Sequence, residues 1–247
     1  MVVVIIDFDN YFGTDVALLT IENFELALTD IVVECEKKFK NFQRINIRLY
    51  GGWFHDTTFT KQASSIQLLL SQIQIFPKVK NGKVINGDVE LVSSLYEIPN
   101  HKWQYTYKEK SGIPRIRINH DIIDDMCNNN RNLCPKYLIY KFTSKKQKQC
   151  HVSGCTHLHK NIFKGIEQKM IDTMIACDVI STVNDESIKG VFILSDDQDH
   201  FPSYALASNN CKQQDKIVIG MKNNNVERFN FATSMLSVFN IEITLMP

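Results

Sequence analysis

The sequence predicts an α/β protein with a Rossmann-like, mostly parallel sheet flanked by helices, and with a β-rich insertion that contains cysteines. In the outer thirds of the chain, short apolar runs alternate with stretches that repeat apolar residues at helical spacing. Two of the apolar runs, VVVIID near the start and GVFILSDDQD near the end, stop at a group of acidic residues. Ligands of open α/β sheets bind beyond the carboxyl ends of the strands, so these acids indicate a functional site.

The N-terminal elements alternate between strand and helix. Residues 2–7 form the first predicted strand, and residues 20–39 space their apolar side chains as a helix does. Residues 45–50 (INIRLY) predict a second strand that ends at a Gly-Gly turn. Residues 61–76 predict a second helix, which stops before Pro77. This order is typical of a βαβ unit.

The same alternation returns near the C-terminus. The predicted elements are a helix at about 160–180, a strand at 190–194, a helix at 201–208, a strand at 216–221, an amphipathic piece at 227–239 and a strand at 241–245. Residues 1–81 and 160–247 are therefore expected to form one doubly wound domain, with residues 82–159 inserted into it.

Composition limits the class of protein. The 247 residues are 44% hydrophobic, which is enough for a large core, and the net charge of +1 gives no overall basic field. Any nucleic-acid binding must therefore depend on a local patch. We find no targeting signal and no apolar run of about 18 residues, so we expect a soluble, cytoplasmic protein without a membrane partner. Its seven cysteines are then expected to be reduced or metal-bound.

Four aspartates are the candidate catalytic residues and metal ligands. Asp7 follows the first strand, Asp197 and Asp199 follow the strand at 190–194, and Asp172 lies in an otherwise apolar stretch of the predicted helix. Such an oxygen-only site suits Mg²⁺ or Mn²⁺. Metals held by carboxylates neutralise a phosphodiester and lower the pKa of a bound water. The alternative is that these residues cap turns and helices, as Asp often does.

Three sequence segments together resemble the NYN branch of the PIN-like nuclease superfamily. They are IIDFDN, KMIDTMIACD and LSDDQDHFP, and they occur in the order that the family has. The resemblance covers about 1–80 and 160–247, and it implies a Rossmann-like sheet and a metal-dependent endoribonuclease. It implies that the metal-binding acids are those four aspartates.

The resemblance also implies supporting residues. Asn10, Lys169 and Asp178 match the family pattern, and Lys169 lies three residues before Asp172, on the same face of the predicted helix. An ion pair on a solvated face is the alternative for Lys169 and Asp172. Asp9 and Asp196 depart from the pattern, Asp196 where the family usually has glycine; we keep both as supporting candidates.

The insertion carries a candidate zinc site. Its cysteines are Cys127, Cys134, Cys150 and Cys155, and His157 or His159 could replace one of them as a ligand. Structural zinc takes four such ligands and would let a polar segment fold without a core. Because the first spacing is wider than usual, scattered reduced cysteines are the alternative.

A basic and aromatic stretch is the candidate surface for single-stranded RNA, the expected partner. Bases stack on aromatic rings while Lys and Arg contact phosphates. The residues are Lys102, Trp103, Tyr105, Tyr107, Lys108, Lys110, Arg115 and Arg117. The alternative is an ordinary half-buried hairpin.

The preferred hypothesis is therefore a divalent-metal-dependent ribonuclease. One alternative is a haloacid-dehalogenase-like phosphatase that uses Asp7 and Asp9, although Tyr11 does not fit its pattern and Asp172 would have no role in it. A second alternative is a non-catalytic RNA-binding module.

Overall fold

The computed structural model divides the chain into two units, residues 1–107 with 168–247 and residues 108–167. The described residues are 1–80, 82–111, 133–135, 137–138, 149, 153–158, 164–213, 215–222 and 226–247. The first unit contains both acidic strand ends, so it is the one that positions the candidate site.

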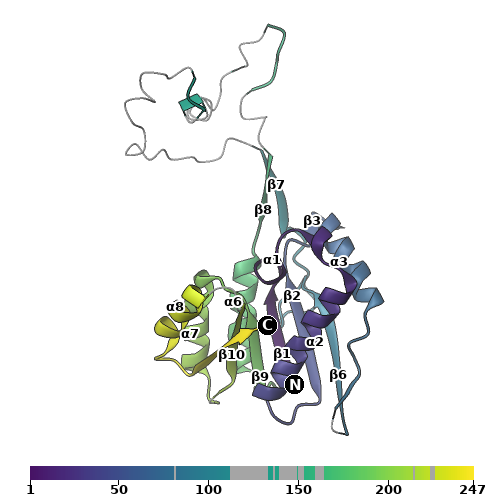
Figure 1. Ribbon diagram of the computed structural model, residues 1–247, viewed down its shortest axis with the longest axis vertical. Coiled ribbons are helices and arrows are strands. Elements are labelled where there is room, and N and C mark those ends of the chain that lie inside the picture. The colour runs from purple at the N-terminus through teal and green to yellow at the C-terminus, as the bar shows by residue number, and fades with distance from the viewer. Residues whose placement is uncertain are drawn as a thin grey trace. The chain divides into compact units, whose positions relative to one another are not determined.

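A seven-stranded sheet forms the centre of the first unit (Figure 1). Its order is β11-β10-β9-β1-β2-β6-β5, and every neighbouring pair is parallel except β5 with β6. The strands are β1 (Val2–Asp7), β2 (Arg44–Tyr50), β5 (Lys78–Lys80), β6 (Lys83–Leu91), β9 (Gly190–Leu194), β10 (Ile217–Lys222) and β11 (Ile241–Met246). The prediction of an α/β protein with a mostly parallel sheet is confirmed.

Helices connect these strands and cover the sheet. They are α1 (Phe8–Phe12), α2 (Ile21–Lys38), α3 (Lys61–Gln72), α6 (Ile171–Asn184), α7 (Phe201–Asn210) and α8 (Val226–Leu236), with the short 3₁₀ helices η1 (Val16–Leu18) and η4 (Gln198–His200). Two small pairs of strands complete the described elements: β3 (Phe54–His55) with β4 (Thr58–Phe59), and β7 (Tyr107–Ser111) with β8 (Lys164–Gln168). Among the described residues, no helix has both the length and the apolar character needed to cross a membrane.

The central strand β1 is buried on both faces, as its unbroken run of β-branched residues predicts. Val2, Val4 and Ile6 belong to a core that includes apolar side chains of α2 and α3. Val3 and Ile5 belong to a second core that includes side chains of α6, α7 and α8. The sheet therefore lies between two helical layers, and the candidate acids Asp7 and Asp197 lie at or beyond the carboxyl ends of two of its strands.

The chain runs outward from β1 in both directions. β2 and β6 follow on one side, and β9, β10 and β11 follow on the other. The boundary between β1 and β9 is therefore the point at which the strand order reverses, the usual place of a ligand site in this class of sheet. Asp7 ends β1 there, and the loop with Asp196 and Asp197 follows β9.

Two details of the organisation differ from the sequence prediction. Strand β6 pairs with β2 inside the main sheet, so the second unit begins at Lys108 rather than at residue 82. The helix expected from about residue 160 starts only at Ile171, because β8 precedes it and Met170 has the positive φ of 66° that interrupts a helix. Lys169 therefore precedes α6 and does not share a helical face with Asp172.

Candidate metal centre

Asp7 occupies the position where β1 ends and α1 begins. Its side chain caps the helix, because Oδ1 accepts a hydrogen bond of 3.3 Å from the backbone N–H of Asn10. The residue is only 9% exposed. The capping bond fixes the carboxylate at the strand end and leaves Oδ2 directed at His200, whose Nε2 lies 3.7 Å away.

The loop after β9 is shaped by its own polar side chains. Ser195 Oγ accepts from the backbone N–H of Asp197 at 3.1 Å, and Asp197 Oδ1 accepts from that of Asp199 at 2.9 Å. Asn10 Oδ1 accepts a bond of 2.7 Å from the backbone N–H of Asp196. This hydrogen bond of Asn10, a predicted supporting residue, links the segment after β1 to the loop after β9.

His200 completes the site. It is the last residue of η4, which Asp197 caps, and a 3₁₀ helix has about three residues per turn, so the two side chains lie on one side of the turn. The imidazole is 2% exposed, and its buried Nε2 makes no hydrogen bond to the described residues. A buried nitrogen without a hydrogen-bond partner is rare in folded proteins and calls for an explanation.

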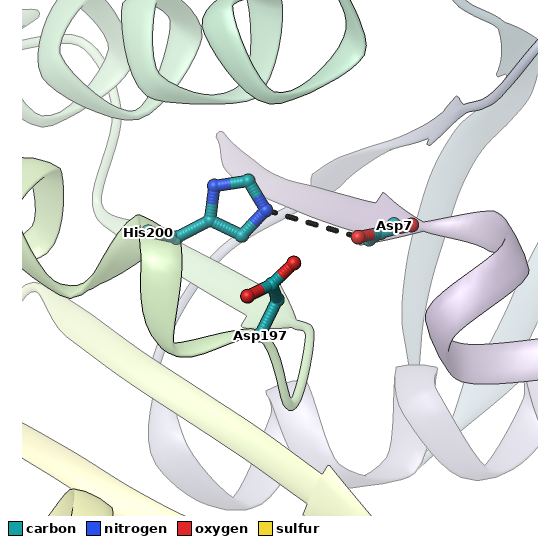
Figure 2. A group of neighbouring side chains, drawn as sticks. All are labelled: Asp7, Asp197 and His200. Carbon is teal, nitrogen blue, oxygen red and sulfur yellow. Dashed lines mark ion pairs between the residues drawn. The ribbon is translucent and has the colours of Figure 1, made fainter. Parts of the chain in front are cut away.

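Asp7, Asp197 and His200 form the one group of potential ligands at metal-binding spacing among the described residues. Each offers an atom, and these atoms lie within 4.8 Å of one another. Figure 2 shows the three side chains directed at a common point. Two ligand atoms on opposite sides of one cation lie about 4.4 Å apart when each metal–ligand bond is about 2.2 Å. A small rotation of a carboxylate would bring the three ligand atoms of this group to that spacing. The donor set and the unmatched nitrogen fit a divalent metal, and we call these residues the metal triad.

The group at ligand spacing therefore differs from the predicted set of four carboxylates, because it contains an imidazole. Two of the four predicted aspartates belong to the triad, whereas Asp172 and Asp199 are exposed and are not at ligand spacing. Asp172 is electrostatically coupled to the site: burial raises its pKa, His200 lowers it, and the carboxylates of Asp7, Asp197 and Asp199 raise it. It lies in the first turn of α6.

A buried aromatic residue supports the triad from α7. Tyr204 is fully buried, and its pKa is raised well above the usual range by burial and by the charges of Asp7 and Asp197. The centroid of its ring is 6.0 Å from that of His200. Its phenol therefore stays neutral and presents a dipole, not a charge, to the carboxylates.

Asp9 and Asp196 lie beside the triad. Asp9 accepts hydrogen bonds from the side-chain amides of Gln62, at 2.7 Å, and Gln168, and burial raises its pKa. Asp196 Oδ1 accepts from the backbone N–H of Lys222 at 3.4 Å. Burial also raises the pKa of Asp196, while the charges of Lys222 and Arg228 lower it.

Asp178 is not brought to the triad. Its Oδ2 accepts from Arg48 Nη2 at 3.0 Å and from the Tyr50 hydroxyl at 2.5 Å, and its Oδ1 accepts from the backbone N–H of Tyr96 at 2.8 Å. The residue is fully buried. These contacts give it a structural role that couples α6 to β2.

The basic and aromatic stretch is described only as far as Ser111: residues 102–106 belong to no strand, and β7 begins at Tyr107. Trp103 is partly buried and packs against the second core, while Tyr105 is 63% exposed. Tyr107 begins β7, and its ring centroid is 5.9 Å from that of His55. Lys102 and Lys108 are exposed. Lys110 lies in β7, and Arg115 and Arg117 lie outside the described residues.

The candidate zinc site is described only in part. Cys134 and Cys155 are half-buried and His157 is exposed. Cys127, Cys150 and His159 lie outside the described residues, so the zinc hypothesis stays a prediction.

His200 is the member of the metal triad that sequence reasoning missed. The feature of the sequence that could have indicated it is its position three residues after Asp197, which is one turn of a 3₁₀ helix.

Comparison of the chain with protein-family models, with curated proteins and with solved structures finds no significant match in any of the three.

Proposed function

We propose that this protein is a divalent-metal-dependent hydrolase of phosphodiester bonds in single-stranded RNA. The observation that carries the proposal is the metal triad, where two carboxylates and a buried imidazole nitrogen without a hydrogen-bond partner converge. The triad lies where the strand order of the sheet reverses. The resemblance of the three acidic segments to NYN nucleases supports the same activity.

The residues have distinct roles in this proposal. Asp7, Asp197 and His200 would hold the cation, and a cation bound there would neutralise the scissile phosphate and lower the pKa of a bound water. Asp172, whose pKa is raised by burial and by the neighbouring carboxylates, faces the site from α6 and orients that water. Asn10 keeps the two strand ends at a fixed separation through its bond to Asp196.

Positive charge for a polyanion lies beside the acids. The side-chain nitrogen of Lys222 is 5.4 Å from the centroid of the Tyr11 ring, and Lys222 and Arg228 both act on the carboxyl of Asp196. These cations are suited to phosphates next to the scissile one. Without them, the cluster of aspartates would repel an RNA backbone.

Two aromatic rings near Asp9, the half-buried ring of Tyr107 and the exposed ring of His55, favour a single strand. Gln168, which donates to Asp9, packs beside Gly52, where an added Cβ would lie 3.3 Å from both Gln168 Cγ and Tyr107 Cδ2. The Tyr107 ring in turn contacts His55. Unpaired bases can stack on such rings, whereas the bases of a duplex are already stacked on one another.

The test is cleavage of end-labelled single-stranded RNA and DNA by the wild type and by Asp197→Asn, with Mn²⁺, Mg²⁺ or EDTA. Asn keeps the size and capping ability of Asp197 but loses its charge. We expect metal-dependent cleavage of RNA that falls by at least about 10³-fold in the variant. Asp215→Asn, an exposed aspartate outside the site, is the matched control and should cleave as the wild type does.

Other outcomes would replace the proposal. Hydrolysis of a small phosphate ester without cleavage of either polymer would favour the phosphatase. RNA binding that survives Asp197→Asn, with no hydrolysis of any substrate, would favour a binding module.

A further inference from the structure

We propose that His200 is a nitrogen ligand that makes the metal triad selective for transition-metal cations such as Mn²⁺ over Mg²⁺. The inference rests on the metal centre of the proposed function, but it concerns which cation binds and not which reaction follows. It adds to the carboxylate chemistry of the site a ligand that the four predicted aspartates do not include.

The first argument is the environment of the imidazole. Nε2 of His200 is buried and lacks a hydrogen-bond partner among the described residues, although carboxylate oxygens lie near it. The closest approach, to Asp7 Oδ2 at 3.7 Å, is an ion-pair contact when the imidazole is protonated, but it is too long for a hydrogen bond (Figure 2). A side chain placed to bond directly to Asp7 would approach to about 3 Å. The longer separation of Nε2 and Oδ2 is expected if both atoms bind a third partner that lies between them.

The second argument is the sign of the surrounding charge. Asp7 and Asp197 contribute two carboxylates to the triad, and Asp172 and Asp199 add negative charge at its edge. The positive groups that act on this region are Lys222 and Arg228, which lower the pKa of Asp196, and His200 itself, which lowers that of Asp172. The triad therefore favours a cation as the missing partner, and excludes an anion.

The third argument concerns selectivity. Mg²⁺ prefers oxygen ligands in a near-ideal octahedron and keeps several of its waters. Imidazole is a better ligand for first-row divalent transition metals than for Mg²⁺, and Mn²⁺ combines this with the carboxylate ligands that the site also offers. A site with one buried imidazole and two carboxylates should therefore bind Mn²⁺ at least about tenfold more tightly than Mg²⁺.

The experiment measures binding, not turnover. Mn²⁺ binding to the whole chain is followed by the loss of the free-ion EPR signal, and competition with Mg²⁺ gives the affinity ratio. Electron spin-echo modulation of the bound Mn²⁺ then reports whether ¹⁴N is coordinated. We expect one tight site with ¹⁴N coupling, absent in Asp7→Asn.

Variants assign the nitrogen. His200→Gln puts an amide oxygen close to the position of Nε2, so we expect loss of the ¹⁴N coupling and a Mn²⁺ to Mg²⁺ affinity ratio reduced by about tenfold. His101→Gln, which removes an exposed histidine outside the triad, is the control and should change neither quantity. The wild-type spectrum tests the proposal even if His200→Gln does not fold.

The proposal is overturned if Mn²⁺ binds in an Asp7-dependent way without ¹⁴N coupling, if His200→Gln keeps the wild-type coupling, or if no Mn²⁺ site is found. Binding and cleavage can fail separately. Nitrogen-coordinated Mn²⁺ without RNA cleavage would retain this inference and reject the ribonuclease, and RNA cleavage without ¹⁴N coupling would do the reverse.

Discussion

The polar cluster around Asp178 and the metal triad both contain buried polar groups of one domain, and they differ in how those groups are matched. In the Asp178 cluster, made of Arg48, Tyr50, Glu90, Tyr96 and Asp178, Arg48 donates to Glu90, to Asp178 and to the backbone oxygen of Ser94. Both oxygens of Asp178 accept hydrogen bonds. Burial alone would lower the pKa of Arg48, but Tyr50, Glu90 and Asp178 raise it above its usual value.

The metal triad has the opposite character. Its two carboxylates have the same charge, and its buried imidazole nitrogen lacks a hydrogen-bond partner among the described residues. A matched cluster contributes to the fold, whereas an unmatched one leaves a place for a partner from outside the chain. The two clusters therefore assign different tasks to the two aspartates of α6, Asp178 and Asp172.

The largest expected effect on stability comes from breaking the matched cluster. Asp178→Ala removes the fully buried one of the two carboxylates that Arg48 contacts. It also leaves the Tyr50 hydroxyl and the backbone N–H of Tyr96 without their acceptor, so it should cost about 3–5 kcal/mol of unfolding free energy. Asp197→Asn instead relieves repulsion between carboxylates, so its unfolding free energy should stay within about 1 kcal/mol of the wild type. Urea unfolding measures both. Equal losses in the two variants would remove the distinction between the clusters.

Adding the missing partner should stabilise only the unmatched cluster. At a Mn²⁺ concentration 100 times its dissociation constant, the unfolding free energy should rise by about 2.7 kcal/mol. Thermal and urea unfolding with Mn²⁺ or with EDTA measure the gain, which Asp7→Asn should abolish and Asp178→Asn should retain if it folds. A gain of the same size in Asp7→Asn would place the cation elsewhere.

The same contrast explains what the sequence could predict. The apolar runs and helical periodicity located the sheet, because burial of apolar side chains depends on local pattern. Asp7 and Asp197 were found because they follow two strands that the topology makes neighbours. The roles of Asp178 and His200 were not found. Each depends on contacts across the fold: Asp178 meets Arg48, which is 130 residues away, and His200 meets Asp7 through the turn of η4.

The remaining differences between the sequence prediction and the structure concern where the inserted unit and helix α6 begin. Residues 83–91 have an ordinary strand pattern, and only their pairing with β2 assigns them to the main sheet. Similarly, the left-handed conformation of Met170, which sets the start of α6, has no clear signal in a residue type that rarely adopts it. Lys169 was misplaced for that reason.

A smaller effect is expected on RNA affinity, where the exposed Tyr105 is compared with Tyr96 of the Asp178 cluster. Tyr105 is 63% exposed, whereas Tyr96 belongs to the Asp178 cluster and its hydroxyl donates to Asp185. Tyr105→Leu should weaken binding of a single-stranded RNA by about 1–3 kcal/mol, the value of one base stacked on an aromatic ring. Tyr96→Leu should leave RNA affinity unchanged. Fluorescence anisotropy at several salt concentrations measures both, and equal weakening would reject Tyr105 as a stacking residue.

The smallest expected change is in the cleavage rate of a variant at Asp9, a residue that shares features with both clusters. Like Asp178 it is bonded through both oxygens, to Gln62 and Gln168, and like the triad it is close to a second carboxylate, that of Asp7. Asp9→Asn keeps one acceptor oxygen, and a flipped glutamine amide can accept from the new N–H. If Asp9 only orients its neighbours, RNA cleavage should fall by no more than about threefold. If Asp9 is the general acid of a phosphatase, hydrolysis of a phosphate ester should be lost.

The pH dependence of stability gives Asp9 a second test. Burial raises its folded pKa above the unfolded value of 3.8, so the folded protein binds more protons than the unfolded chain in the acidic range just above that value. The contribution of Asp9 to the unfolding free energy therefore falls as pH rises through this range. Asp9→Asn lacks this titrating group. The unfolding free energy of the variant minus that of the wild type should therefore increase from pH 3 toward pH 7. Urea unfolding at a series of pH values measures the difference, and a relative stability that decreases with pH would show that the two amides outweigh burial at this carboxylate.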